Sequence, residues 1–186
     1  MTYTPFNQQP REFVIHPYQL KQFNDRWFLL SCPLANDRYP FNPEFILTLA
    51  LDRISEKFDY VENEEYFESI VDLKARFDEI IGVTLYQDKD LEDIYFAVSP
   101  HSVDYVRTKW LHTTQIELDE ETQGYFRSKY PSLKDHTFFS IECRENSELY
   151  SKFASYTGDL SLVEPIYMRE RLRERIIKAA ESYNCL

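Results

Sequence analysis

The order of strand-like and helix-like segments in the second half of the chain limits its fold more than any other feature. Four segments have the pattern of β-strands and two, the second and the fifth, have helical spacing, in the order 93–98, 100–109, 111–118, 136–144, 147–156 and 161–164. This β-α-β-β-α-β order predicts a ferredoxin-like split unit. Ser99 is expected to cap the first helix and Gly158 to end the second. A last helix is expected from Pro165 to about Tyr183, with an apolar stripe of Ile166, Leu172, Ile176 and Ile177.

Short β-type runs dominate the first half of the chain. They lie at residues 11–16, 18–23, 26–32, 45–51 and 54–60, separated by Pro17, by Asn24-Asp25 and by a proline-rich stretch from 33 to 43. Five closely spaced strands predict a small barrel. Helical spacing from Tyr66 to Ile81, followed by Gly82, predicts a connecting helix. We therefore expect an α+β chain with a barrel at 1–61, a connecting helix and linker at 62–87, and the ferredoxin-like unit at 88–186.

Charge and cysteine content limit the environment and the partners. The formal net charge is -11, and residues 57–186 carry 16 Lys+Arg against 26 Asp+Glu. Nucleic-acid affinity comes largely from cationic side chains, so any such contact must be local. Cys32, Cys143 and Cys185 show no disulfide or zinc spacing. With neither a membrane-spanning run nor a secretory signal in the sequence, we expect a soluble protein of the reducing cytoplasm.

Several kinds of catalytic site are excluded or disfavoured. The three glycines, Gly82, Gly124 and Gly158, are isolated, which excludes glycine-rich phosphate loops. A Cys143 nucleophile with His112 or His136 as its base is geometrically possible, but a buried thiol sharing an inward face with Phe139 and Ile141 is the favoured interpretation. The acidic runs at 62–65 and 119–121 are interpreted as solvated surface. We expect no enzyme, no cofactor and no metal.

Three motifs in the first half resemble a known family. They are His16-Pro17-Tyr18, Asn24-Asp25-Arg26-Trp27-Phe28-Leu29-Leu30 and Leu51-Asp52-Arg53-Ile54. Together they are similar to the WYL domain, although Phe28 replaces the central tyrosine and removes a hydroxyl. Two later motifs, Trp110-Leu111-His112-Thr113-Thr114-Gln115 and Val163-Glu164-Pro165, resemble the extension that follows WYL domains.

The resemblance implies the effector region of a bacterial transcription regulator. It implies an SH3-like or Sm-like barrel followed by a ferredoxin-like extension, and a barrel that senses nucleotides or short single-stranded nucleic acid. A helix-turn-helix head usually precedes the barrel and binds promoter DNA. Because the sequence begins where the first barrel strand is expected, we expect these residues to lack that head.

The candidate ligand-binding residues all come from the first three motifs. Arg26 and Arg53 are expected to bind phosphate or carboxylate, although Arg53 pairing with Asp52 or Glu56 is the structural alternative. Trp27 offers a stacking face but is more often a core anchor. The remaining candidates are His16, Tyr18 and Lys21, for each of which an ordinary structural role is the alternative to ligand binding.

Two hypotheses for the whole chain remain open. In the first, the barrel senses a ligand and the extension mediates self-association, presumed to give a homodimer, or transfers the signal. In the second, the chain is an oligomerisation scaffold that binds no ligand. The arginines at 169, 171, 173 and 175 form a basic stripe, but the interleaved Glu170 and Glu174 favour ordinary ion pairs on the helix surface.

Overall fold

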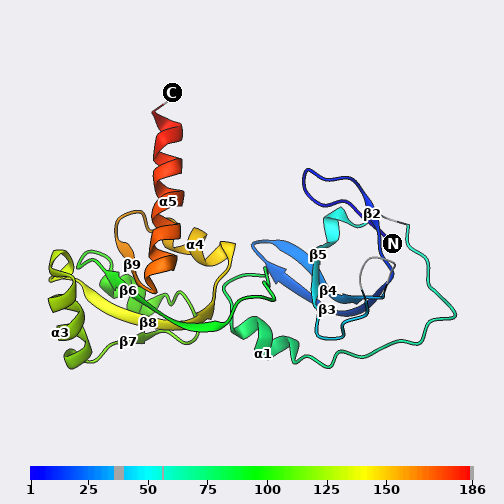
Figure 1. Cartoon of the computed structure of the whole chain (residues 1–186), viewed down its shortest axis with the longest axis horizontal. Helices are drawn as coiled ribbons and strands as arrows, with labels where there is room; N and C mark the ends of the chain where they lie inside the picture. The colour runs from blue at the N-terminus through cyan, green and yellow to red at the C-terminus, as the bar shows by residue number, and fades with distance from the viewer. Residues whose placement is uncertain (36–39, 56, 185–186) are drawn as a thin grey trace. The chain divides into compact units, whose positions relative to one another are not determined.

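The computed structural model describes residues 1–35, 40–55 and 57–184. The chain is a mixture of antiparallel β-sheets and helices (Figure 1). It divides into two compact units, the first formed by residues 1–77 with 82–87, and the second by residues 78–81 with the chain from 88 onward. Each unit is described by itself below.

Unit 1 contains a two-stranded and a three-stranded sheet. Strand β1 (Thr2–Tyr3) pairs with β2 (Arg11–Glu12). The larger sheet has the order β3-β4-β5, formed by β3 (Ile15–Phe23), β4 (Arg26–Pro33) and β5 (Leu47–Ala50). The predicted Asn24-Asp25 turn joins β3 to β4, and both of its residues have positive φ, 48° and 57°. This two-residue geometry matches the twist of the flanking strands and fixes their register.

The described part of unit 1 does not form a closed barrel. An isolated bridge pairs Tyr3 of β1 with Ile54, directly after the 3-10 helix η1 (Leu51–Arg53). The expected strand at 54–60 is therefore wrong beyond that bridge in the described residues. The expected helix from Tyr66 is shorter and forms only α1 (Leu73–Asp78), because Tyr66 and the backbone of Phe67 hydrogen-bond to β3 and hold this segment extended.

Unit 2 is built on a four-stranded antiparallel sheet with the order β7-β8-β6-β9. Its strands are β6 (Leu91–Val98), β7 (Ile116–Glu117), β8 (Thr137–Arg144) and β9 (Leu160–Glu164). Helix α2 (Val103–Thr108) follows β6, and α4 (Ser147–Ala154) follows β8. The element order inferred from the sequence is present, and a split β-α-β pattern has this arrangement of strands.

The two faces of this sheet pack against different elements. Ile94, Phe96 and Val98 of β6 point to one face, where α4 and α5 (Ile166–Tyr183) contribute Leu149, Phe153, Met168 and Leu172. Ala97 points to the other face and packs with Phe126 of α3 (Glu120–Lys129). The alternation follows from the two-residue period of a strand. As predicted, Cys143 is buried on the same face as Phe139 and Ile141.

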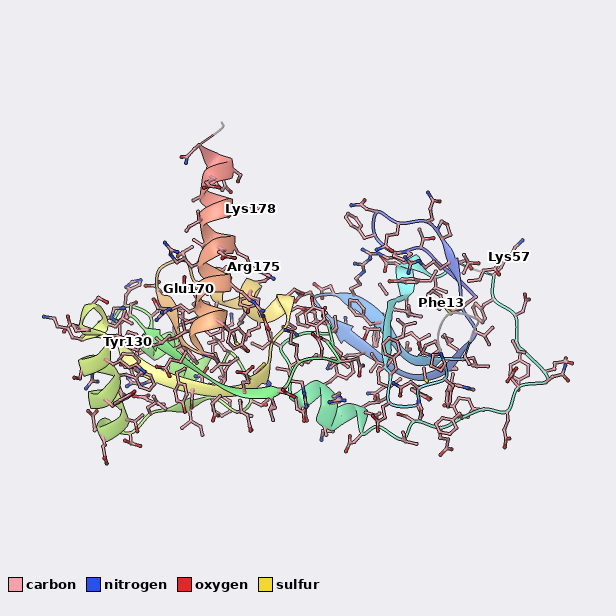
Figure 2. All side chains as sticks on the ribbon, viewed as in Figure 1. Phe13, Lys57, Tyr130, Glu170, Arg175 and Lys178 are labelled. Carbon is pink, nitrogen blue, oxygen red and sulfur yellow. The ribbon has the colours of Figure 1, made fainter. Side chains whose placement is uncertain are left out.

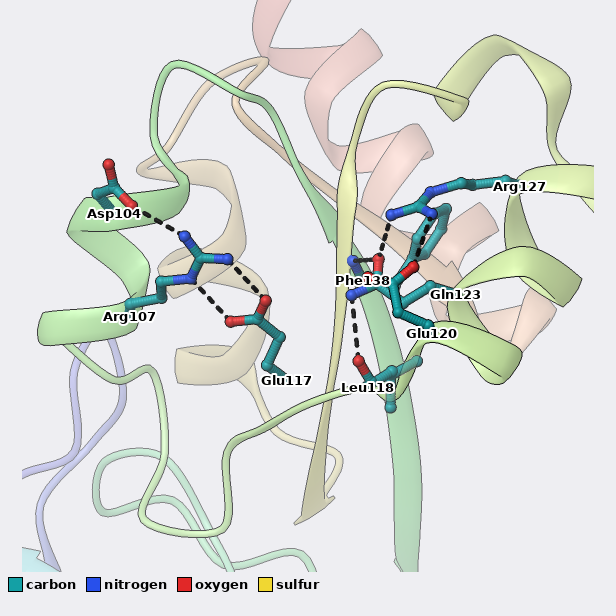
Figure 3. Close-up of polar contacts among 8 residues, drawn as sticks. All are labelled: Asp104, Arg107, Glu117, Leu118, Glu120, Gln123, Arg127 and Phe138. Atoms are coloured by element: carbon teal, nitrogen blue, oxygen red, sulfur yellow. Dashed lines mark hydrogen bonds and ion pairs between the residues drawn. The ribbon is translucent and has the colours of Figure 1, made fainter.

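Helix α3 was not predicted, because its first residues were interpreted as a charged loop. Asp119 caps it by accepting a hydrogen bond from the Thr122 amide at 2.8 Å. The helix has acidic residues in its first turn and basic residues in its last, which complements the helix dipole. The buried Gln123 side chain of α3 accepts a hydrogen bond from the Phe138 amide of β8 (Figure 3). A short 3-10 helix η2 (Pro131–Leu133) leads into β8.

Other boundaries in unit 2 also differ from the prediction. Ser102 and not Ser99 precedes α2, since the Ser99 hydroxyl instead donates to Asp159 at 2.7 Å. Strand β7 is shorter than predicted. Before it, the Thr114 hydroxyl donates to the Glu142 carbonyl of β8, and the Gln115 side-chain amide donates to the Val106 carbonyl of α2.

Helix α5 is exposed beyond Leu172, and Lys178 projects from this part (Figure 2). Three residues of its predicted apolar stripe, Ile166, Ile176 and Ile177, are exposed, and Met168 is buried instead. In the part of the chain that the structure describes, no helix is long and apolar enough to cross a membrane.

Candidate functional site

Two of the predicted site residues are near Asp52 in unit 1: Arg26, which hydrogen-bonds to it, and Arg53, which follows it in the sequence. Arg26 begins β4, and its guanidinium donates two hydrogen bonds to Asp52, with Nε–Oδ1 at 2.9 Å and Nη2–Oδ2 at 2.5 Å. These bonds raise the pKa of Arg26 and lower the pKa of Asp52, and the charge of Arg53 lowers the Asp52 pKa further. The arrangement is a bidentate fork with a second cation nearby.

Arg53 also lies against an aromatic ring. Its guanidinium carbon is 5.3 Å from the centroid of Phe6, a side chain that is 70% exposed. The expected alternative pairing of Arg53 with Glu56 falls on a residue outside the described ranges. We name the group of Arg26, Asp52, Arg53 and Phe6 the arginine cluster. It combines cations with an aromatic face, as sites for phosphate and a stacked base do.

His16 lies in a different environment, among aromatic rings. It is buried, and its Nδ1 accepts a hydrogen bond from the Phe67 amide at 3.3 Å. The rings of Phe41, Tyr66 and Phe67 pack around it at centroid distances of 5.8 to 6.3 Å. These contacts match the structural alternative, a histidine with satisfied hydrogen bonding at the start of a strand.

The other three predicted residues do not join the arginine cluster. Burial and the Cys32 thiol raise the pKa of Tyr18 to about 12, and the Tyr18 ring contacts Tyr66. The Lys21 ammonium lies 4.8 Å from the centroid of Phe77. Trp27 is 47% exposed and occupies the sheet face opposite Arg26, as adjacent strand residues must. Of the predicted residues, Arg26 and Arg53 belong to the arginine cluster, whereas His16 and Tyr18 both contact Tyr66.

An apolar pocket of about 850 Å³ occupies one face of the larger sheet of unit 1. Leu20 and Leu29, which pair across β3 and β4, form part of its wall, and Leu51 of η1 forms another part. Its polar lining includes His16, Asp59 and Glu64. No lysine or arginine side chain belongs to its described lining. The volume falls within the range of small-molecule sites.

The motif at 110–115 makes hydrogen bonds within unit 2. His112 is buried, and its Nδ1 lies 2.8 Å from the Thr114 hydroxyl, which in turn bridges to the backbone of Glu142. Desolvation lowers the pKa of His112 and, at Cys143, raises the thiol pKa to about 11. The Cys143 thiol is therefore protonated near neutral pH. Among the described residues, no group of three or more potential ligands could hold a metal ion.

Sequence reasoning missed Phe6 and Tyr66 as parts of these sites, and it named Asp52 only as a possible partner of Arg53 and not of Arg26. Asp52 belongs to the Leu51–Ile54 motif, so its acidic side chain next to Arg53 was the available signal. Phe6 and Tyr66 lie far along the chain from the residues they contact, and no local pattern identifies them.

No protein-family model matches the sequence, and no curated protein matches it. Among solved structures, the chain is similar to proteasome accessory factor B/C (PafBC) of Arthrobacter aurescens, with 13% sequence identity and a TM-score of 0.39. The match covers 97% of this chain and 24% of that protein, so the chain spans about a quarter of its length. A TM-score at this level does not establish a common fold, and the family hypothesis therefore rests on the sequence motifs.

Proposed function

We propose that this chain is the ligand-sensing effector region of a bacterial transcription regulator of the WYL type. In this proposal residues 1–61 correspond to the WYL domain, whose described strands form two sheets and not a closed barrel. Residues 62–87 correspond to the connection and 88–186 to the ferredoxin-like extension. The region acts in the cytoplasm without catalysis or a cofactor. Promoter DNA is bound by the helix-turn-helix head of such a regulator and not by these residues.

The observation that carries this proposal is the bidentate contact of Arg26 with Asp52, next to Arg53, whose guanidinium lies over the Phe6 ring. The ligand is a nucleotide or a short single strand, whose phosphate displaces the Asp52 carboxylate from the Arg26 guanidinium and is also attracted by the charge of Arg53. Arginine forks bind phosphate and carboxylate with the same geometry, which makes this exchange chemically reasonable. The exposed ring of Phe6 offers a face for a base.

Fluorescence polarisation of a labelled short single-stranded DNA tests the proposal directly. The whole chain is titrated across a salt series, beside the double variant Arg26→Ala/Arg53→Ala. A matched control, Lys57→Ala/Lys74→Ala, removes the same charge from two exposed positions of unit 1. We expect saturable binding that salt weakens, that the arginine variant loses and that the lysine variant keeps.

Two results would overturn this assignment of the ligand. Absence of binding at low salt removes the phosphate-bearing ligand altogether. Equal loss in both double variants shows attraction by total charge and not by the arginine cluster.

The apolar pocket favours a second class of ligand for the same sensing function. With no lysine or arginine side chain in its described lining, it suits an uncharged apolar molecule better than a phosphate. Nile red fluorescence with the whole chain provides the test. We expect Leu20→Lys, which puts a charge into the pocket, to abolish the emission increase. Gln22→Lys adds the same charge on the same strand outside the lining and should leave the increase intact.

The scaffold alternative is favoured by the exposed second half of α5. Ile176, Ile177 and Tyr183 are 45%, 41% and 75% exposed, and an apolar helix face of this kind suits a homodimer contact. Light scattering on the whole chain should give a dimer that Ile176→Glu/Ile177→Glu converts to a monomer, whereas Lys178→Glu does not. A monomeric wild-type chain at high concentration excludes the scaffold.

A further inference from the structure

A second, polar pocket of about 350 Å³ lies in unit 2, beside α2 and the segment that leads from α4 to β9. Its lining includes two lysines, Lys109 and Lys152, and two tyrosines, Tyr105 and Tyr156. Asp159 and Thr157, which carries a hydroxyl, also line the pocket. None of these residues belongs to the sites described above.

Each lysine of this pocket is held beside a tyrosine four positions away. The Lys109 ammonium donates a hydrogen bond to the Tyr105 hydroxyl at 2.7 Å, which raises the lysine pKa and keeps it charged. The Lys152 ammonium lies 5.8 Å from the centroid of Tyr156. The two tyrosine rings are in turn 6.2 Å apart, so one aromatic pair positions both cations at the same pocket.

These two lysines differ from most cations of unit 2 in having no carboxylate partner. Arg107 pairs with Asp104 and Glu117, and Lys129 pairs with Glu164. Within the described ranges, neither Lys109 nor Lys152 forms an ion pair. With the carboxylate of Asp159, the charged groups of the lining sum to +1, in a chain whose net charge is -11. The pocket is therefore locally positive.

The single carboxylate in the lining is already satisfied by other groups. Asp159 accepts a hydrogen bond from the Ser99 hydroxyl at 2.7 Å, and its pKa is lowered by hydrogen bonds from Ser99 and Ser102. It therefore does not take either lysine as an ion-pair partner. Thr157, whose φ is 53°, turns the chain after α4 and adds a hydroxyl to the wall.

We propose that this pocket binds the phosphate group of a small metabolite between the ammonium groups of Lys109 and Lys152. A phosphate monoester carries close to two negative charges near neutral pH, which two lysines match. Lysine binds phosphate as a point charge, so no planar fork is required. The volume suits a small ligand. This site goes beyond the proposed function, because none of its residues belongs to the arginine cluster.

Isothermal titration calorimetry of inorganic pyrophosphate with the whole chain tests the site at low ionic strength. We expect saturable binding that weakens as salt is added and that persists in the Arg26→Ala/Arg53→Ala variant. Lys109→Gln/Lys152→Gln keeps most of the side-chain length but removes both charges, and should weaken binding at least roughly tenfold, about 1.4 kcal/mol. The control Lys134→Gln/Lys178→Gln removes the same charge from exposed positions of unit 2 outside the lining, and should bind normally.

Amide chemical-shift mapping of the wild-type chain locates the bound pyrophosphate independently of any variant. Shifts centred on residues 155–159 and 105–109 support the proposal, and shifts centred elsewhere overturn it. The proposal also fails if no saturable binding occurs or if both lysine pairs lose it equally. Binding of single-stranded DNA without binding of pyrophosphate would likewise refute a small-metabolite site. The Arg26→Ala/Arg53→Ala variant should bind pyrophosphate normally at this site, which separates this test from that of the proposed function.

Discussion

Replacing Gln123 with leucine should destabilise unit 2 strongly, although the change is nearly isosteric. Gln123 is 3% exposed and makes three hydrogen bonds (Figure 3). Its Nε2 donates to the Leu118 carbonyl at 3.1 Å, while its Oε1 accepts from the Phe138 amide at 3.2 Å and from Arg127 Nη2 at 2.9 Å. It thus joins the start of α3 to β8 through two backbone groups.

The expected loss follows from which partners are left unpaired. Leucine leaves the Phe138 amide and the Leu118 carbonyl without their side-chain partner, and an unsatisfied buried backbone group costs about 1–3 kcal/mol. Arg127 is partly exposed and recovers hydration, so it adds little. We therefore expect a loss of about 2–4 kcal/mol in the free energy of unfolding.

Urea unfolding followed by tryptophan fluorescence measures this loss, provided that the signal reports unit 2 alone. The chain has two tryptophans, Trp27 in unit 1 and Trp110 in unit 2, so the experiment uses a Trp27→Phe background. Arg127→Ala is the control and should cost less than about 1 kcal/mol. A Gln123→Leu variant as stable as its parent would refute the argument that these bonds satisfy otherwise unpaired groups.

Three further predictions concern protonation and charge. Burial lowers the pKa of His112, so the unfolded state binds more protons than the folded state. Unit 2 should therefore lose stability as the pH falls from about 6.5 toward the folded pKa. In urea titrations, His112→Gln should remove this pH dependence, whereas His101→Gln should not. Cys32 and Cys143 are fully buried, and the pKa values of both thiols are raised. In a Cys185→Ser background, a thiol reagent at pH 8 should therefore label neither until urea is added. Rapid labelling of the native chain would contradict the burial. Asp52→Asn should strengthen binding of single-stranded DNA a few-fold, because it removes the carboxylate that competes for Arg26; weaker binding would show that Asp52 orients the arginine instead.

Patterns carried by neighbouring residues predicted the structure well, and features that depend on distant partners were missed. The helix predicted at 147–156 and the strand predicted at 136–144 agree closely with the bounds of α4 and β8, because capping and alternation are local properties. The helix predicted from Tyr66 is shorter because Tyr66 bonds the carbonyl of Pro17, which is 49 positions away. Nothing in the local sequence identifies that contact.

The candidate site shows the same division between local and distant information. The motifs identified Arg26 and Arg53 as cations, and the alternation of β4 placed Trp27 on the opposite face from Arg26. They gave no indication that Asp52 accepts both hydrogen bonds from Arg26, or that Lys21 lies against Phe77. Residue type therefore predicts which chemistry is available, while the partner of each charge decides whether it is free to meet a ligand.

The partners of the cations therefore distinguish the two proposed anion sites. At the arginine cluster a ligand must displace the Asp52 carboxylate from Arg26. The binding free energy is therefore only the difference between two arginine–anion contacts, and we expect modest affinity. Such an exchange frees Asp52, which belongs to the same 3-10 helix as Leu51, a residue that lines the apolar pocket. In unit 2 the lysines lose only tyrosine contacts and water, so binding there requires no exchange of ion pairs. The first arrangement suits a sensor, because ligand binding changes internal contacts, whereas the second suits simple capture of an anion.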